Sequence, residues 1–503
     1  MSKKFVNFSL LTLLIAAFSV AASAATYTVT KTADTNDGTC DADCSLREAV
    51  AAANASADDD TIVFSSLFDS EQTITLAGTE IVFAANGSLT ITGPGAALLT
   101  ISGNNASRII STGPNVVANI SGITFTAGNG VGALNSGRAG AIYNAGGTLL
   151  IESCVITGNS ASNGGGLNNA SAGSPAVPGN LTLRFTTVSN NTASGSGGGM
   201  QNFSTSTIII DRSAFIGNVS NGTTGGGGGQ FNGAVRITNS TFANNSAPSG
   251  SGGGMQSNGT IGAIITNSTF SGNSSLNNGG GIHRGSTNVN FFIRNTIVAG
   301  NDGTAVSPDI TNSAGGIQSQ GNNIIGVTGT STGWIGSDLL DTDPMLGPLG
   351  SNGGPTQSFV PMPGSPAIDA GQNCVLDLSC AANNPPEAVV TDQRGISRPQ
   401  GPIVDIGSVE VEAAGAPAVL GGRVLFRGVY GLPNAAITVT DGVTTWRGRT
   451  SSFGYFRFEG LPTGITYTIT VSDKRESYGS LDVELNGDTT DIEITPAALH
   501  RDK

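Results

Sequence analysis

The chain has 503 residues, of which 74 are glycine and only 11% are charged, and its formal net charge is −13. A hydrophobic content of 38% is enough for a core, which argues against global disorder, and the length allows two or three domains or one long solenoid plus a module. Net acidity with only 22 basic residues argues against nucleic-acid binding, which needs a basic face.

Residues 1–24 have the features of a secretory signal peptide. Lys3 and Lys4 form a charged start, residues 10–22 are mostly apolar, and the Ala-Ser-Ala of residues 22–24 fits a cleavage site. The apolar part is short for a membrane span, and no later segment could serve as one; a retained N-terminal anchor is the alternative. We therefore expect an exported protein of the cell surface or extracellular space, in a bacterial cell envelope, with no transmembrane span in the mature chain.

Residues 25–114 are predicted to form an N-terminal capping region and the first rungs of a solenoid. Ser45 with Glu48 three positions on is a capping box, so residues 46–54 form the one convincing helix. The run Cys44 to Ala49 resembles the CSLREA motif at the start of secreted parallel β-helix proteins. An acidic run offers oxygen ligands for Ca²⁺, but it lacks the order of a calcium loop, so a solvated turn is the favoured reading. This run consists of Asp34, Asp37, Asp41 and Asp43.

The five cysteines agree with export to an oxidising compartment. Cys40 and Cys44 lie close together, as do Cys374 and Cys380, and each pair would close a small disulfide loop. Metal binding is the weaker alternative, because neither pair has zinc-ligand spacing or a nearby histidine. Cys154 is left over, and its place in an inward-facing column predicts a buried small residue instead of a nucleophile.

A repeat occupies residues 115–330, and each copy combines an F-x-x-N-like motif with a run of glycines. Successive marker asparagines lie 27 to 32 residues apart, which is typical of a solenoid. The markers are Asn159, Asn191, Asn218, Asn245, Asn273 and Asn301. Their side chains are predicted to form a structural ladder of amide hydrogen bonds from rung to rung.

Residues before each marker alternate with a period of two, as in Leu149/Ile151, and β-branched and aromatic residues are enriched there. Each repeat is therefore predicted to contain two or three short strands, with an inward phenylalanine such as Phe242 stacked on the next rung. The residue before each marker is Gly or Asn, which tolerates a left-handed corner. The glycine run is predicted to be a flat strand or a place where two backbones approach closely.

The motifs FIGN, FANN and FSGN, with GGGL, GGGM and GGGI, resemble the repeats of polymorphic outer membrane proteins, which are adhesins of the autotransporter class. The resemblance implies a right-handed parallel β-helix of the pectin-lyase-like fold. The chain departs from that class at its end, LHRDK, which has no barrel-like strands. The predicted fold class is all-β, a right-handed parallel β-helix followed by a small β-sandwich.

Residues 331–412 are predicted to be the C-terminal part of the β-helix. They carry PGSPAIDAG from Pro363, TDQRGISRP from Thr391 and DIGSVE from Asp405, after DPMLGPLGSNGGPTQ from Asp343. In this order the motifs closely resemble the choice-of-anchor Q region of exported β-helix proteins. The resemblance implies surface display and no activity.

Residues 413–418 are a small-residue linker, and residues 419–497 are predicted to form a β-sandwich of about seven short strands with Gly and Pro turns. The string GLPNAAITV followed by TSSFGYFRFEGLPTG resembles carboxypeptidase regulatory-like modules with a transthyretin-like fold. Such modules are usually accessory, and nothing in this region predicts catalysis.

One column of charged residues is the candidate for chemistry if the protein is an enzyme. Glu152, Arg184 and Asp211 lie seven residues before their markers, so they would stack about 5 Å apart on adjacent rungs, near Arg212 and Arg236. Carboxylates with a basic residue would suit a polysaccharide lyase or glycoside hydrolase. Alternating signs equally predict an ion-pair ladder, which is the reading we favour.

His283 follows a glycine run and is one of only two histidines, so a histidine triad or metal centre would lack partners. It is predicted to be a surface or loop residue, and no metal site is predicted.

The sequence therefore predicts a non-catalytic binding and adhesion scaffold at the cell surface or outside the cell. A polysaccharide lyase or glycoside hydrolase is the alternative, and a purely structural envelope protein is the second alternative. The expected ligand is a surface glycan or a protein, bound on the side where loops vary in length. We expect no cofactor, apart from the Ca²⁺ reading above, and a monomer.

Overall fold

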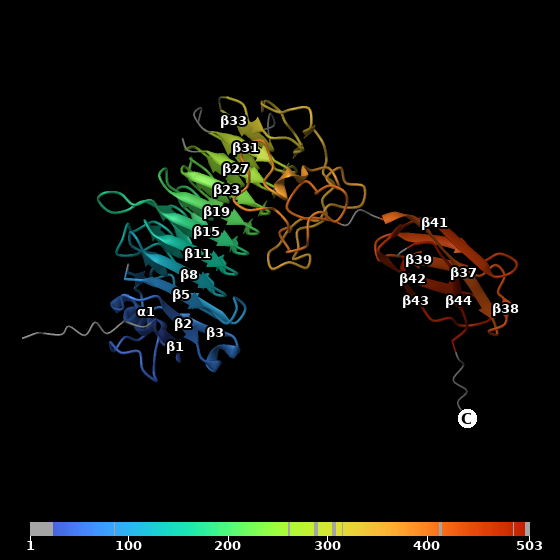
Figure 1. The fold of residues 1–503 in the computed structure, drawn as a ribbon, viewed down its shortest axis with the longest axis horizontal. Coiled ribbons are helices and arrows are strands. Elements are labelled where there is room, and N and C mark those ends of the chain that lie inside the picture. Colours follow the sequence, from blue (N-terminus) through green and yellow to red (C-terminus); the bar gives the residue numbers. More distant parts are fainter. Residues whose placement is uncertain are drawn as a thin grey trace, which may run out of the picture.

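The computed structural model describes residues 24–84, 86–259, 262–285, 290–303, 308–313, 315–411, 415–485 and 487–497. The predicted signal peptide lies outside these ranges except for Ala24. Nearly all regular structure within them is β-strand, and a parallel β-solenoid precedes a C-terminal sandwich, which confirms the predicted fold class (Figure 1). None of the helices in the described ranges is long and apolar enough to cross a membrane.

Most turns of the solenoid contribute strands to three long parallel sheets, and the central turns add a fourth, short sheet. Sheet A contains β1 (Thr26–Val29), β2 (Asp60–Phe64), β5 (Ser88–Thr92), β8 (Val117–Ser121), β11 (Thr148–Glu152), β15 (Asn180–Arg184), β19 (Thr207–Asp211), β23 (Ala234–Thr238), β27 (Ala263–Thr266), β31 (Phe291–Arg294) and β34 (Gln318–Ser319). Sheet B contains β3 (Gln72–Thr75), β6 (Leu99–Ser102), β9 (Thr124–Thr126), β12 (Val155–Thr157), β16 (Thr187–Ser189), β20 (Ala214–Ile216), β24 (Thr241–Ala243), β28 (Thr269–Ser271), β32 (Ile297–Val298), β35 (Ile324–Ile325) and β36 (Leu339–Leu340).

Sheet C contains β4 (Ile81–Phe83), β7 (Ile110–Thr112), β10 (Ile142–Ala145), β14 (Leu167–Ala170), β18 (Met200–Asn202), β22 (Gly229–Phe231), β26 (Met255–Ser257), β30 (Ile282–Arg284) and β33 (Ile310–Asn312). Sheet D contains β13 (Ser160–Ala161), β17 (Thr192–Ala193), β21 (Val219–Ser220), β25 (Ser246–Ala247) and β29 (Ser274–Ser275). The chain visits the sheets in the order A, B, D, C in each central turn.

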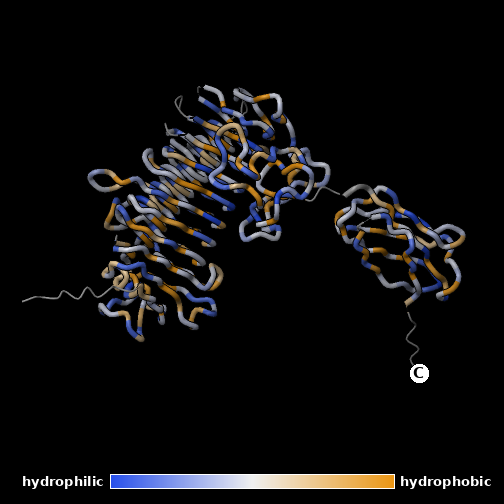
Figure 2. The backbone as a smooth tube through the Cα atoms, viewed as in Figure 1, coloured by the Kyte–Doolittle hydropathy of each residue, from blue (hydrophilic) through white to orange (hydrophobic). Residues whose placement is uncertain are grey.

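The core follows from the predicted alternation, which Figure 2 shows as alternating hydrophobic and hydrophilic stretches along the stacked turns. Inward residues such as Leu149 and Ile151 are fully buried. Phe242 stacks between Phe215 and Phe270 with ring centroids 4.6 Å apart on both sides, as predicted. In this column like side chains meet at the spacing of the strands, while the inward column through Leu149 holds apolar residues of different sizes, from Ala118 to Phe291.

The six marker asparagines form one buried column. Each Nδ2 donates to the Oδ1 of the next marker at 2.8–3.0 Å, and each backbone N–H donates to the same oxygen. The last marker, Asn301, donates in the same way to Asp309 Oδ1. Burial raises the pKa of the Asp309 carboxyl above its ordinary value.

The structure confirms the predicted left-handed corners and decides between the two predictions for the glycine run. The residues before the markers have positive φ, as expected, for example 53° at Asn190 and 63° at Gly217. The glycine run is not a flat strand, because its first glycine bends the chain with φ of 69° at Gly197, for instance. The close-approach reading is correct: a Cβ on Gly198 would lie 2.4 Å from the Gly227 oxygen of the next turn.

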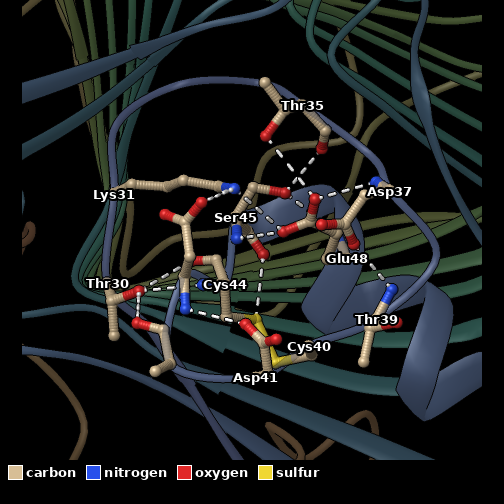
Figure 3. The surroundings of a disulfide bond; sticks show 12 residues. Thr30, Lys31, Thr35, Asp37, Thr39, Cys40, Asp41, Cys44, Ser45 and Glu48 are labelled. Atoms are coloured by element: carbon tan, nitrogen blue, oxygen red, sulfur yellow. Dashed lines mark hydrogen bonds and ion pairs between the residues drawn. A yellow bond between two sulfur atoms is a disulfide. The ribbon is translucent and has the colours of Figure 1, made fainter.

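Helix α1 (Leu46–Ala55) closes the N-terminal end of the solenoid and confirms the predicted helix and capping box. Glu48 N–H donates to Ser45 Oγ at 3.1 Å, and Ser45 N–H donates to Glu48 Oε2 at 2.7 Å (Figure 3). A disulfide joins Cys40 and Cys44 beside this cap, and a second joins Cys374 and Cys380, both as predicted. Cys154 is a free, buried thiol whose pKa burial raises to about 12.

Residues 343–411, which follow the last solenoid strand, dock against the corner between sheets A and B and against the outer face of sheet B. The Thr241 hydroxyl contacts both Gln393 and Ser408, and Asn239 Nδ2 donates to the Thr391 oxygen at 2.8 Å. The predicted motifs supply a charged cluster, buried except for the half-buried Arg394, that holds this C-terminal segment together. The cluster consists of Asp392, Arg394, Arg398, Asp405 and Glu410.

The sandwich consists of two four-stranded sheets around a separate core. One sheet contains β37 (Gly415–Phe426), β38 (Tyr430–Gly431), β41 (Tyr455–Thr463) and β44 (Thr489–Ile494), and the other contains β39 (Ala436–Thr440), β40 (Thr445–Arg449), β42 (Ile465–Ser472) and β43 (Leu481–Leu485). Because β37 begins at Gly415 and pairs with β41, the last four residues of the predicted linker belong to the first strand.

Candidate functional site

A cleft of about 240 Å³ lies between the outer face of sheet A and residues 386–391 of the C-terminal segment. Its floor comes from β15, β19 and β23, whose outward side chains include Thr182, Arg184, Ile209 and Asp211. The period of two that buries Leu183 and Ile210 turns these neighbours outward. The cleft is therefore the place where the docked segment meets the predicted charged column.

The charged groups of the cleft neutralise one another. Asp211 Oδ2 accepts from Arg212 Nε at 2.9 Å and lies 2.7 Å from its terminal nitrogen, and the Arg184 Nε lies 3.4 Å away. The other side of Arg184 contacts Glu387 Oε1 at 3.2 Å. Burial raises the pKa of the Asp211 carboxyl above its ordinary value, although Arg212 and Arg184 act in the opposite direction.

The structure stacks Glu152, Arg184 and Asp211 in register on β11, β15 and β19, as the spacing required. Glu152 lies one strand beyond the lining of the cleft, and Arg184 stands between the two carboxylates, which are two strand separations, about 10 Å, apart. The column thus has the alternating charges of an ion-pair ladder, and no second carboxylate of the predicted column shares the cleft with Asp211.

The corner below the cleft holds two unusual residues. Six residues before each marker the chain turns with positive φ, and three of the six rungs place asparagine there, as at Asn239. The two rungs of the cleft instead have Phe185 at 48° and Arg212 at 47°, conformations that cost such side chains about 1–2 kcal/mol. The Arg212 guanidinium lies 4.5 Å from the Phe185 ring centroid, and this contact offsets part of the cost.

A second hollow of about 240 Å³ continues along the same face of sheet A, lined by Arg236, Ile264, Phe292 and Asn383 among others. In register, Arg236 lies between Ile209 and Ile264, so the two hollows share one row of outward residues. We call the combined surface, from β15 to β31 with residues 382–391 as its wall, the sheet A trough. The Arg236 side chain makes no hydrogen bond or ion pair with the other residues that the structure describes.

Several buried polar atoms at the wall of the trough lack hydrogen-bond partners among the described residues. They are Asn239 Oδ1, Thr266 Oγ1 and Arg294 Nε. Such atoms need water or another polar partner, because an unpaired buried polar group costs about 1–3 kcal/mol. The contact between sheet A and this part of the segment is therefore imperfectly matched.

One wall of this cleft was not predicted from the sequence. Glu387 and the wall of residues 386–391 were missed, because nothing local links them to rungs some 180 residues earlier. The corner pair had a signal, since Phe185 and Arg212 occupy a position where other rungs have Ser or Asn. The predicted loop side is a different surface from the trough, which lies on a strand face.

His283 corrects the prediction of a surface or loop residue. It lies on β30 with only 6% of its surface exposed, and its Nδ1 is 2.8 Å from Thr311 Oγ1. The register continues the outward row of Gln201, Gln230 and Gln256, which neighbouring turns cover. Burial lowers the pKa of the imidazole to about 4.

His283→Gln is expected to make the protein less sensitive to acid. The folded pKa of about 4 lies below the unfolded value of 6.5, so the stabilisation is present above pH 6.5 and is lost as the pH falls toward 4. The loss is at most about 3 kcal/mol at 1.36 kcal/mol per pKa unit. Urea unfolding of both proteins at pH 7 and pH 4.5 measures it, and an equal acid-induced loss in both would refute the assignment.

The acidic run near the N-terminus is engaged in turns. Asp34 pairs with Arg47 at 2.8 Å, Asp43 pairs with Lys31 at 3.1 Å, and Asp37 and Asp41 accept from backbone N–H groups two residues on. In the part of the chain that the structure describes, no group of three or more His, Cys, Asp or Glu is placed to hold a metal ion. These contacts favour the turn reading over a Ca²⁺ loop.

No family model matches this chain, and neither a curated protein nor a solved structure is similar enough to count as a match.

Proposed function

We propose that the protein is exported and surface-associated, and that its β-solenoid is a non-catalytic scaffold for binding a surface glycan or protein. The observation that carries this proposal is the state of Asp211. Its Oδ2 accepts from Arg212 and faces Arg184, so the carboxylate is part of an ion-pair ladder in which two arginines stabilise its negative charge. The trough instead offers a long, partly apolar surface on which Arg236 makes no hydrogen bond or ion pair with the described residues, and such a surface suits binding.

The rival function, polysaccharide cleavage, has one observation in its favour. Burial raises the pKa of Asp211 in a cleft, which is a property of catalytic carboxyl groups. A glycosidase also needs a second carboxylate across the bond, and the other carboxylate that lines this cleft, Glu387, is paired with Arg184, which also contacts Asp211. The second rival, a purely structural envelope protein, has no use for the trough.

The test exposes the chain without residues 1–24 to a panel of neutral and acidic polysaccharides, with and without Ca²⁺. We expect retention on at least one of them and no release of soluble oligosaccharides. Arg236→Glu should weaken retention about tenfold, because it reverses the unpaired charge of the trough. Arg447→Glu, an exposed substitution of equal charge in the sandwich, is the matched control.

Two outcomes would overturn the proposal. Soluble products that disappear in Asp211→Asn would establish an enzyme. Folded protein that neither binds nor cleaves anything in the panel, and that also binds no protein from the cell surface, would leave the structural role.

A further inference from the structure

The sheet A trough gathers positive charge on an acidic protein. Residues 115–330 contain six basic residues, and four of them lie on this face or its edge. They are Arg184, Arg212, Arg236 and Arg294. Two carboxylates, Asp211 and Glu387, lie beside these four arginines, so the trough has a net charge of +2 on a chain whose net charge is −13.

The two carboxylates differ in how firmly they are held. The Asp211 side chain is only 14% exposed and contacts two arginines. The Glu387 side chain is 72% exposed, and its one ion pair with the described residues is the 3.2 Å contact with Arg184. An exposed pair of this kind contributes about 0–1 kcal/mol, so another anion can replace Glu387 at little cost.

The residues on both sides of Glu387 nevertheless hold it beside Arg184. Pro385 and Pro386 restrict the backbone immediately before it. The disulfide Cys374–Cys380 and the buried pair Arg398–Glu410 fix the segment on both sides. Between these anchors the wall meets sheet A with unpaired polar atoms, so the segment is firmly held at its ends and loosely matched at the trough.

We propose that Glu387 is an internal stand-in for an anionic group of the ligand, and that the trough takes a linear glycan whose carboxylate or sulfate replaces Glu387 at Arg184. This inference rests on the proposed binding function. Arg236 lies two strands from Arg184, about 10 Å along the axis, and would meet a second anionic group of the same chain.

The outward-facing side chains in the row that contains Arg236 suit sugar rings better than nucleotide bases. Ile209, Ile264 and Phe292 offer apolar contact along the row, and Phe292 is the one aromatic side chain among the residues that line the two hollows. Single-stranded nucleic acid binds by stacking successive bases on several aromatic side chains. The charge pattern with so few rings therefore favours an anionic glycan.

The test is affinity electrophoresis of the chain without residues 1–24 in gels containing alginate, dextran sulfate, dextran or single-stranded DNA. Alginate supplies carboxylates, dextran sulfate supplies sulfates, and dextran is the uncharged match. Glu387→Gln should bind the anionic glycan about threefold to fivefold more tightly than the unaltered chain, because the Glu387 carboxylate no longer competes for Arg184. Glu71→Gln, which changes the net charge equally at an exposed site near the N-terminal end, should leave binding unchanged.

The outcomes separate the two proposals. Binding of a glycan that Glu387→Gln and Glu71→Gln change equally would overturn the role of Glu387 and leave the scaffold intact. Binding of dextran as strong as that of the charged glycans would overturn the anionic class. DNA binding with the same gain in Glu387→Gln would replace the glycan by a nucleic acid. Absence of binding by every form to every polymer would overturn the glycan-binding role itself.

Discussion

Replacing Asn245 by alanine is expected to lower the free energy of unfolding of the solenoid by about 4 kcal/mol. The Asn245 amide accepts from Asn218 N and Nδ2 at 3.0 and 2.9 Å, and it donates to Phe215 O and Asn273 Oδ1 at 2.9 and 2.8 Å. The site is fully buried, so water cannot replace these four bonds without entering the core. Guanidinium unfolding followed by circular dichroism measures the change.

A matched control is the exposed Asn277, whose replacement by alanine should change stability by no more than about 0.5 kcal/mol. Because each turn contacts mainly its neighbours, hydrogen exchange in Asn245→Ala should accelerate first in the turns around that residue. If both substitutions cost the same, the amide column would contribute no more than an ordinary surface position.

Arg398→Met is expected to destabilise the docked C-terminal segment by about 3–5 kcal/mol, the usual cost of removing one partner of a buried ion pair. Arg398 and Glu410 are both fully buried at 2.6 Å, and Arg398 also donates to Gly407 O at 2.9 Å. Methionine leaves the Glu410 carboxylate without its cation. The segment should then detach from sheet B, and limited proteolysis within residues 343–411 should report it while the solenoid stays resistant.

The double variant Arg398→Met with Glu410→Leu is the control. Removing both charges leaves no uncompensated ion, so the double variant should resist the protease better than Arg398→Met alone. A double variant that is more sensitive by the sum of the two single effects would show that the pair acts only through its separate hydrogen bonds, such as that from Asp405 N–H to Glu410 Oε2.

The repeating part of the fold was predictable because its rules are local. The capping box of Ser45 and Glu48, the inward stack through Phe242 and the left-handed corner before each marker all follow from residue type and spacing. The charged register of Arg184 and Asp211 follows from the period of the repeat alone. Once the rungs are aligned, position within a rung determines position on the surface.

The rest depends on contacts distant in sequence, which no periodicity encodes. The docking of the segment through Gln393 and Ser408 onto Thr241 joins residues 152 and 167 positions apart, and it creates the cleft wall that contains Glu387. His283 was misplaced for a related reason. Its outward position on a strand was visible in the repeat, but its covering by neighbouring turns requires the folded geometry.

The amide column of the solenoid also has a direction, with consequences for the length of the rod. Every marker passes a donor toward the C-terminal rung and offers an acceptor toward the N-terminal rung, so whole repeats can be inserted or deleted inside the column without altering either neighbour. At Asp309 the series closes, because one carboxylate oxygen accepts from Asn301 and the other from Val327 N–H. An ionised carboxylate has no N–H to donate to a further rung, so the Asp309 side chain ends the column of amide hydrogen bonds and limits its length.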